Sequence, residues 1–250
     1  MLALQLNLGC IPLERRLGTS FVATLDFIVA AITSKNIKEF QFILLKWYKI
    51  SGRKFHWRNK GLTNYQLIIA ETLLQRTKAE TVSRFYKQFI KSFPNWLSLA
   101  SSNRRELESY LMPIGLYRQR AARLQSLAIE MQRRGGRLPK DRTELESIPF
   151  LGQYIANAIE LLIFKRPLPL IDVNMARVLE RYFGKRNLSD IRYDPYLQNL
   201  AVKIIDTPKA KELNWSILDF AALVCRARNP LCLKCPLNRK CTAFKTQQFA

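Results

Sequence analysis

Apolar residues recur at helical spacing along almost the whole chain, and this periodicity restricts the fold more than any other feature. Near the start, for example, Phe40, Ile43, Leu44 and Tyr48 fall on one helical stripe. Gly and Pro interrupt the pattern, and no stretch sustains the alternation of polar and apolar residues typical of a strand. We therefore predict an all-α protein, with helices over 36–50, 64–74, 79–93, 104–111, 118–133, 153–164, 173–183 and 209–224.

Charge gives the first indication of a partner. The chain has 41 Lys and Arg against 19 Asp and Glu, a formal net charge of +22 on 250 residues. Such an excess favours a polyanionic partner, either nucleic acid or an acidic membrane surface, over a basic surface without a ligand. The basic residues are spread along the chain among aromatic residues, so we expect a folded nucleic-acid-binding face instead of a disordered basic arm.

The sequence also bears on location. With 48% hydrophobic residues, the chain is able to bury a core, and no apolar run reaches the roughly 18 residues that a membrane span requires. Residues 1–16 are apolar and end in Arg15 and Arg16, the reverse of the charge order in a secretory signal. We expect an intracellular protein of the cytoplasm or nucleoid, without a membrane partner. We assign no role to an N-terminal extension over residues 1–35.

Four of the five cysteines lie close together near the C-terminus. Cys225, Cys232, Cys235 and Cys241 are spaced x6, x2 and x5, whereas Cys10 stands alone. Clustered thiolates of this kind indicate a metal centre, and the spacing alone leaves both structural zinc and an iron–sulfur cluster open. Lys and Arg residues surround the four ligands, so a metal-ordered loop would present cations to a phosphate backbone.

Residues 148–156, Ile-Pro-Phe-Leu-Gly-Gln-Tyr-Ile-Ala, join two predicted helices through a short turn that exposes backbone N–H groups to an anion. This segment resembles the helix–hairpin–helix motif of the endonuclease III superfamily of DNA glycosylases, whose usual form is Leu-Pro-Gly-Val-Gly-x-x-Thr-Ala. Residues 170–178, Leu-Ile-Asp-Val-Asn-Met-Ala-Arg-Val, resemble the stretch that holds the family's catalytic aspartate, here Asp172. The match covers about residues 36–245, including 55–58, 71–77 and 114–117.

The resemblance implies a structural [4Fe–4S] cluster on the four clustered cysteines, with zinc as the alternative, and a double-stranded DNA partner that contains a mismatch. It also implies that Leu151, Gly152 and Gln153 of the hairpin contact DNA. Two residues depart from the usual motif: Phe150 replaces the first glycine, and Ile155 replaces Thr or Ser. Because Phe does not favour φ > 0 as Gly does, we expect an altered hairpin with a changed grip on phosphate.

The resemblance further implies a monomer of two helical lobes with a DNA-binding cleft between them. Residues 60–166 would form a six-helix barrel lobe that contains the hairpin. Residues 36–59 together with 167–250 would form the lobe that holds the cysteine loop. Asp172 would then face a pocket at the junction of the lobes, a common place for a ligand site.

Breaking an N-glycosidic bond builds positive charge on the sugar, which a buried carboxylate stabilises. Asp172 is the candidate for this role, and by resemblance Asn174 would orient it. The alternative is that Asp172 caps the helix over 173–183, and the two roles are compatible.

Tyr154 and Glu71 complete the predicted active site. Tyr154 occupies the position at which bifunctional members of the family have a lysine that attacks the sugar. Since a phenol cannot form an imine, we expect base excision without strand cleavage, as in the family's thymine–DNA mismatch glycosylases; a tyrosine packed in the core is the alternative. Glu71, by resemblance, reaches the flipped base as a hydrogen-bond acceptor or proton donor, unless it is a solvated flank of its helix.

Arg76 and Tyr117 match the positions at which family members insert side chains into the base stack. Insertion offsets an unstacking cost of a few kcal/mol, which is smallest at a mismatch. A helix-surface arginine and a packed tyrosine are the alternatives. His56 is the only histidine, so we do not expect catalysis that depends on histidine.

Three functions compete on these observations. The first is a monofunctional DNA glycosylase of base excision repair that acts on T or U opposite G. The second is an adenine glycosylase without the C-terminal domain that recognises 8-oxoguanine, because the sequence ends nine residues after Cys241. The third is a non-catalytic DNA-binding protein, which the altered hairpin at Phe150 keeps open.

Overall fold

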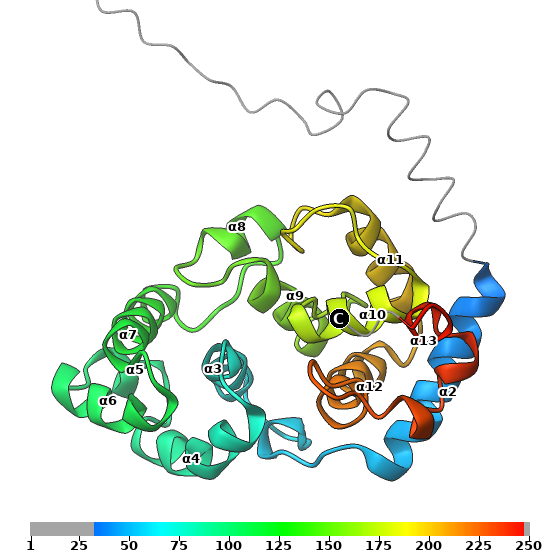
Figure 1. The fold of residues 1–250 in the computed structure, drawn as a ribbon. Helices are drawn as coiled ribbons and strands as arrows, with labels where there is room; N and C mark the ends of the chain where they lie inside the picture. The colour runs from blue at the N-terminus through cyan, green and yellow to red at the C-terminus, as the bar shows by residue number, and fades with distance from the viewer. Residues whose placement is uncertain (1–32, 248–250) are drawn as a thin grey trace, which may run out of the picture.

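The computed structural model describes residues 33–247, and all regular structure among them is helical, as predicted. The N-terminal extension, apart from its last three residues, and Cys10 lie outside the described residues. No described helix is long and apolar enough to cross a membrane. The α-helices (Figure 1) are α2 (Ser34–Ser51), α3 (Asn64–Leu74), α4 (Ala79–Ser92), α5 (Trp96–Ala100), α6 (Arg104–Leu111), α7 (Tyr117–Arg133), α8 (Arg142–Ser147), α9 (Gln153–Leu162), α10 (Val173–Phe183), α11 (Pro195–Ile205), α12 (Ala210–Leu223) and α13 (Thr242–Lys245). Short 3₁₀ turns are η2 (His56–Arg58), η3 (Met112–Ile114), η4 (Cys232–Lys234) and η5 (Asn238–Lys240).

Each predicted helix is present, with ends within two residues of the prediction. The periodicity missed α5, α8, α11 and α13. Three of these, α5, α8 and α13, have only five, six and four residues, too few to show a helical repeat. α11 begins at Pro195, which fits the first turn of a helix because its missing N–H would have no partner there. The buried Asp194 side chain caps this helix by accepting a hydrogen bond from the Leu197 N–H at 2.7 Å.

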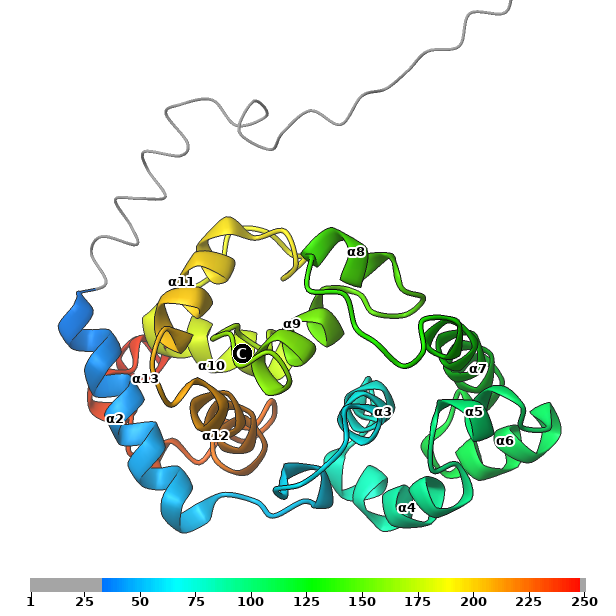
Figure 2. The same cartoon turned by 180° about the vertical axis from the view of Figure 1, so that it is seen from behind.

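The buried side chains form three clusters. One joins α2 to α10, α11 and α12 and includes Phe40, Leu179 and Phe220. A second lies among α3, α4, α5, α6 and α7, and a third lies where α8 and α9 meet α3 and α7. In Figure 1 and, from behind, in Figure 2, α9 lies between the α3–α7 group on one side and α10, α11 and α12 on the other. The division into two lobes after residues 59 and 166 stays a proposal, and Phe55 and Trp57, which precede the first boundary, pack in the second cluster.

The connection between α2 and α3 is anchored by one buried carboxylate. Asp219 on α12 is fully buried. Its two oxygens accept hydrogen bonds from the Arg53 N–H and Nε at 2.7 and 2.8 Å, and from Arg58 Nη1 and Nη2 at 2.8 and 3.0 Å. The Arg58 guanidinium also lies 5.1 Å from the ring centres of both Phe55 and Trp215. Charge, hydrogen bonds and ring contacts thus hold the segment that leads into α3.

Replacing Asp219 should therefore destabilise the protein strongly. In Asp219→Asn, the nearly buried Arg58 guanidinium loses its anion, Arg53 keeps only the more exposed Glu80, and the amide NH₂ would face the donors of both. Breaking a buried pair in this way costs about 3–5 kcal/mol, which urea unfolding would measure. Glu108→Gln, at the more exposed Arg104–Glu108 pair, is the control and should change stability by less than about 1 kcal/mol. Similar small losses in both variants would contradict the anchoring role.

Candidate active site and DNA-binding elements

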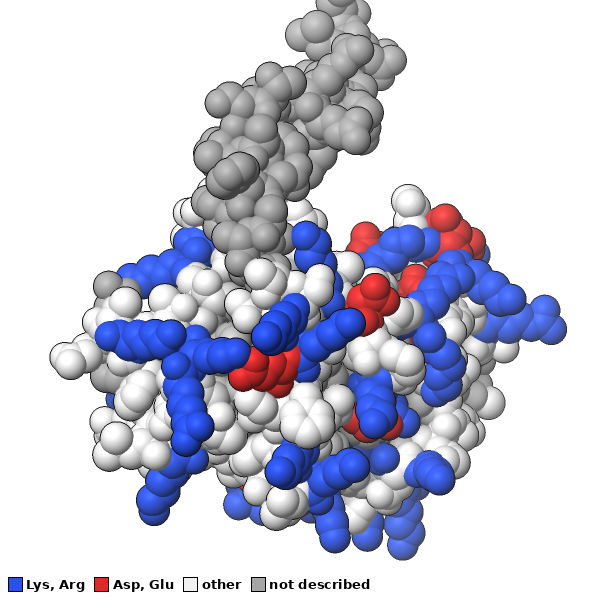
Figure 3. Space-filling model, turned by 90° about the vertical axis from the view of Figure 1, so that its right-hand side faces the viewer, with Lys and Arg blue, Asp and Glu red and all other residues white. Residues whose placement is uncertain are grey.

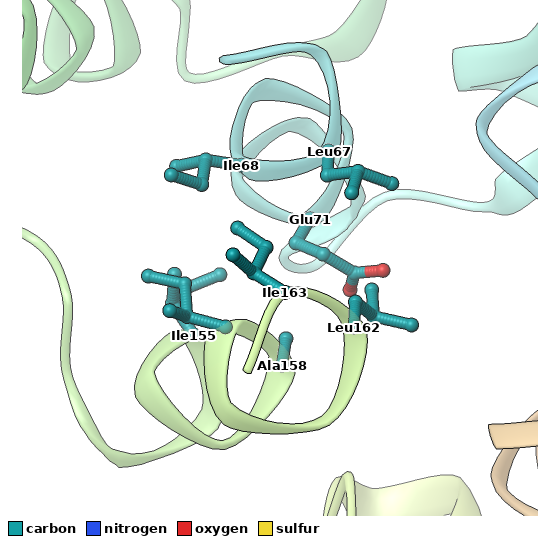
Figure 4. A pocket seen from close by; sticks show the side chains of 8 residues that line it. Leu67, Ile68, Glu71, Ile155, Ala158, Leu162 and Ile163 are labelled. Atoms are coloured by element: carbon teal, nitrogen blue, oxygen red, sulfur yellow. The ribbon is translucent and has the colours of Figure 1, made fainter. Parts of the chain in front are cut away.

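Glu71 is a buried carboxylate on α3, where the helix packs on α9. A capping box of Thr63 and Gln66 fixes the start of α3. Glu71 is 5% exposed and lines a small cavity of about 180 Å³ that is otherwise apolar. Figure 4 shows its carboxylate on the Leu162 side of the cavity, away from Ile155. The lining residues are Leu67, Ile68, Glu71, Ile155, Ala158, Ile159, Leu162 and Ile163. The solvated alternative for Glu71 is therefore wrong.

Burial raises the pKa of Glu71 to about 7, and the nearby charge of Asp172 adds to the rise. The cation of Arg58 and a hydrogen bond from Tyr154 act in the opposite direction. Since the two Arg58 Nη atoms already donate to Asp219, Glu71 has a cation nearby but no ion-pair partner. A carboxyl group whose pKa lies near neutrality is suited to give or accept a proton.

Tyr154 lies on the first turn of α9 and donates a hydrogen bond from its hydroxyl to Glu71 Oε2 at 3.3 Å. Burial, followed by the charges of Glu71 and Asp172, raises the pKa of this phenol well above its ordinary value. The hydroxyl therefore stays protonated and acts as a donor. Tyr154 also packs against two of the apolar clusters, so its packing and its contact with Glu71 occur together.

Asp172 is the N-cap of α10, as the structural alternative predicted. Its Oδ1 accepts hydrogen bonds from the backbone N–H groups of Asn174 and Met175 at 2.9 and 2.8 Å. Its Oδ2 accepts one from Asn174 Nδ2 at 2.6 Å. Capping does not remove the carboxylate from the site, because its charge acts on the pKa of both Glu71 and Tyr154.

Arg177, which the sequence did not single out, fixes the orientation of Asn174. Its Nη2 donates to Asn174 Oδ1 at 3.1 Å, and the guanidinium also donates to the backbone oxygens of Ala221 and Cys225. Because a guanidinium only donates, the Asn174 oxygen faces Arg177 and its NH₂ faces Asp172. The Asp172 carboxylate therefore accepts three hydrogen bonds from Asn174 and Met175, and Arg177 orients it indirectly through the Asn174 amide.

The hairpin turn places its phenylalanine in a conformation that glycine favours. Phe150 adopts φ 68°, the left-handed region, and the Leu151 N–H donates to Ile148 O at 3.1 Å. Phe is thus accommodated at a position that requires φ > 0, and a changed grip on phosphate stays a prediction. The Arg123 guanidinium stacks on the Phe150 ring at 5.3 Å, a cation–π contact that offsets part of the cost of this conformation.

The three hairpin residues predicted to contact DNA differ in exposure. Leu151 is fully buried, because its side chain packs in the cluster beneath the turn, so the predicted contact of this residue with DNA would have to come from its backbone. Gly152 is exposed and is the N-cap of α9. No side chain caps this helix, which leaves N–H groups of its first turn available to a phosphate. Gln153 is partly buried and donates to Gln198 Oε1 at 3.2 Å.

Of the two predicted insertion residues, Arg76 is exposed in a loop and has φ 55°. Tyr117 is partly buried, packs against the cluster among α3–α7, and lies under the Arg118 guanidinium. The preceding residue, Leu116, was not predicted, yet it is 53% exposed and has φ 51°. Met112, earlier in the same connection, is also exposed, at 58%. The exposure of Leu116 depends on backbone conformation, which helical periodicity does not reveal.

The four C-terminal cysteines line one cavity with about 330 Å³ of empty space, open to solvent. Among residues 33–247, no group of three or more His, Cys, Asp or Glu is arranged to hold a single metal ion. Burial, followed by the charges of the neighbouring thiolates, raises the pKa of Cys235 despite a backbone hydrogen bond, to about 12. A cationic centre would favour the thiolate form of neighbouring cysteines, because metal ligands bind deprotonated. Four thiols around one cavity fit a centre bound by four thiolates, either an iron–sulfur cluster or zinc.

Basic side chains spread over the surface as the composition predicted. On the face shown in Figure 3, Lys and Arg lie across the whole surface with a few acidic groups among them. Several of the acidic groups are already paired, as in Glu130 with Arg133 and Arg134. The excess positive charge therefore remains available to an anionic partner.

Comparison with known proteins gives consistent relatives. Residues 69–194 match the model of the HhH-GPD superfamily of base excision DNA repair proteins. A thymine-DNA glycosylase of Aeropyrum pernix is 38% identical over 206 residues, 80% of this chain and 92% of that protein. A thymine/uracil-DNA glycosylase of Pyrobaculum aerophilum is 35% identical over 84% of this chain and 94% of its own. The solved structure of a thermostable thymine-DNA glycosylase superposes with a TM-score of 0.79 and 30% identity, over 86% of this chain and 99% of that one. Adenine DNA glycosylases are also related, at 25–30% identity, and this chain spans 36–61% of their length.

The raised pKa of Glu71 predicts a stability that depends on pH. Glu71 ionises near its ordinary pKa of 4.5 when unfolded and near 7 when folded, so the folded state binds more protons in that window. The free energy of unfolding therefore falls as the pH rises from about 4.5 to 7. Glu71→Gln removes this dependence of the free energy of unfolding on pH. The variant should be more stable than the wild type by on the order of 3 kcal/mol at about pH 8, and should show no such gain at about pH 4.5.

Urea unfolding at several pH values measures this difference. The matched control is Glu160→Gln, because Glu160 is equally buried but accepts a hydrogen bond from Arg166 Nη1 at 2.8 Å. That variant loses an ion pair and should not gain stability. A stability difference for Glu71→Gln that is independent of pH would refute the assignment.

Proposed function

Because the chain belongs to the HhH-GPD superfamily of base excision DNA repair proteins and is a DNA glycosylase, we propose that it is a monofunctional enzyme specific for thymine or uracil opposite guanine. The hydrogen bond between Tyr154 and Glu71, with Asp172 close enough to affect both, is the observation that supports this proposal most. The glycosylases of Aeropyrum pernix and Pyrobaculum aerophilum bear names that state thymine, or thymine and uracil, as the base removed. The proposed location is with the cell's DNA.

The proposed mechanism assigns separate tasks to the two carboxyl groups. Asp172, anchored through Asn174, stabilises the positive charge that develops on the sugar as the base leaves, and it orients the attacking water. Glu71 contacts the flipped base. With a pKa of about 7, it is protonated in part of the molecules at neutral pH and is able to protonate the departing pyrimidine.

Tyr154 decides between base removal and strand cleavage in this proposal. A lysine at its position would offer an amine to the sugar, whereas the protonated phenol only donates a hydrogen bond to Glu71. The product is then an abasic site in an intact strand. Lys165, the next candidate amine, has its Nζ engaged with the Leu162 carbonyl oxygen.

DNA binding would use three parts of the molecule. The uncapped first turn of α9, at Gly152 and Gln153, would hold a phosphate. Arg76 and the turn that contains Tyr117 would enter the base stack once the target nucleotide has left it. The preserved left-handed turn at Phe150 removes the main reason for favouring a non-catalytic protein.

We also propose that Cys225, Cys232, Cys235 and Cys241 hold a [4Fe–4S] cluster. Its chemistry when bound is the neutralisation and cross-linking of four thiolates, which stabilises the loop around them. Arg181 of α10 donates to the Arg226 carbonyl oxygen at 2.8 Å and approaches Cys225 Sγ at 3.6 Å. These contacts attach the cysteine loop to α10 through the protein's own side chains. The loop would then present its Lys and Arg residues to the DNA backbone.

A panel of duplexes tests the proposed substrate. Purified protein is incubated with T·G, U·G, A·G, A·8-oxoguanine and undamaged pairs, and strand breaks are scored before and after alkali. We expect alkali-dependent breaks at T·G and U·G. Breaks at adenine-containing pairs alone would favour an adenine glycosylase, and salt-sensitive binding without any product would favour a non-catalytic protein.

Asp172→Asn tests the mechanism on the same substrates. It should slow base release at least about 100-fold, because an amide cannot offset the charge on the sugar. Duplex binding should persist, since Asn is also a good N-cap. Asp190→Asn is the control, because Asp190 pairs with Arg192 in a surface turn and should keep the wild-type rate. An unchanged rate in Asp172→Asn would remove Asp172 from the mechanism.

Tyr154→Lys tests the assignment of reaction type. On a duplex with an abasic site, the new amine should condense with the C1′ aldehyde, release water and form an imine that borohydride reduces to a stable covalent adduct. We expect a trapped band on a denaturing gel for this variant. Tyr154→Phe is the control and should give no band beyond that of the wild type. A strong adduct with the wild type would refute the monofunctional assignment.

A further inference from the structure

Two short loops each present one exposed residue in the left-handed conformation. The first, residues 75–78, joins α3 to α4 and contains Arg76 at φ 55°. The second, residues 112–116, joins α6 to α7 and contains Leu116 at φ 51°. Neither residue is a glycine, so each conformation is strained. Strained residues persist where the surrounding structure over-determines them, and they cluster at functional sites.

The Arg120 side chain, near the start of α7, supports the first loop. Its Nη2 donates to the Gln75 carbonyl oxygen at 2.8 Å and to Thr77 Oγ1 at 2.7 Å, the groups on either side of Arg76. Its Nη1 reaches the Leu73 oxygen at 3.4 Å. The carbonyls at the C-terminal end of α3 have no partner within the helix, and a cation there also complements the helix dipole.

The same guanidinium supports the second loop. Arg120 Nε donates to the Gly115 carbonyl oxygen at 3.0 Å, immediately before Leu116. One rigid, planar group therefore bonds to both loops, on either side of Arg76 and next to Leu116. A lysine has a single ammonium group and could not reproduce this fork.

The position of the Arg120 guanidinium is electrostatically unfavourable by itself. Burial, followed by the charges of Arg123 and Arg76, lowers the pKa of Arg120. The protein thus places a partly buried cation beside two others, against the simple repulsion of like charges. Acceptors from both loops compensate for that repulsion.

We infer that Arg120 is a positioning residue that fixes Arg76 and Leu116 relative to each other before DNA binds, so that both side chains enter the base stack as one preassembled unit. This inference rests on the proposed glycosylase function. Loops that are already ordered lose little conformational freedom on binding, so more of the binding energy is available to open the duplex. The benefit is largest where a stacked and paired base must be displaced.

The test compares base release from paired and unpaired uracil. One duplex contains a U·G mismatch, and the other places the same uracil opposite a tetrahydrofuran abasic analogue. Rates are measured with enzyme in excess over DNA. Arg120→Gln should slow release from U·G on the order of 100-fold, the loss expected for a misplaced site, and slow release from unpaired uracil by less than about 10-fold.

A spectroscopic measurement separates positioning from folding. A 2-aminopurine next to the target brightens when the stack opens, and Arg120→Gln should reduce this rise at U·G while melting near the wild-type temperature. Arg133→Gln is the control: it removes the same charge from the same helix at a residue paired with Glu130, and should match the wild type. Arg120→Lys should restore only part of the lost rate.

Thr77→Val is the gentler variant if Arg120→Gln does not fold. This variant keeps every charge and deletes one acceptor of the Arg120 guanidinium, the Thr77 hydroxyl. It should therefore slow base release from U·G by about 10-fold, with a smaller effect on unpaired uracil. Equal losses on both duplexes, or no loss in either variant, would overturn the inference. A wild type inactive on both duplexes would instead contradict the proposed function.

Discussion

The packing of α9 between α3 and α12 is the constraint on which the site depends. Ile155 and Ile159 of this helix join the cluster beneath the hairpin, whereas Leu161 and Leu162 join the cluster around α10 and α12. One helix thus contributes to two cores, and its first turn lies beside the hairpin. Tyr154 is consequently held in the first turn of α9, within hydrogen-bond distance of Glu71. Any shift of α9 would move the hairpin and the active site together.

Two buried carboxylates illustrate how the surroundings decide what a charge does. Asp219 receives four hydrogen bonds from Arg53 and Arg58 and fixes the chain between α2 and α3. Glu71 is also near Arg58, but the paired nitrogens of that guanidinium are occupied by Asp219. Glu71 is therefore desolvated without full compensation, and its pKa rises to about 7. The structural role of one carboxylate is a condition for the chemical role of the other.

Local patterns in the sequence predicted the local parts of this structure. Helix positions and the loop cysteines follow from periodicity and spacing, and the capping alternative for Asp172 follows from its place before a helix. The sequence did not predict the burial of Leu151 or the exposure of Leu116, because both depend on how a turn is oriented against its core. It also missed Arg120 and Arg177, most of whose hydrogen-bond acceptors lie more than 40 residues away along the chain. Only the packing of distant helices brings such donors and acceptors together.

The left-handed conformations show how the protein supports strain near its DNA-binding elements. Arg76, Leu116 and Phe150 each pay a cost of roughly 1–2 kcal/mol for φ > 0, which is considerable against a typical total stability of about 5–15 kcal/mol. Their supports lie on one helix: Arg120 of α7 bonds to the first two loops, and Arg123 stacks on Phe150. Residues three apart share a helix face, so this face of α7 contacts all three strained turns. A different conformation of these loops would therefore require a change in α7 as well. The ring of Phe150 also provides a surface on which Arg123 stacks, which glycine would lack.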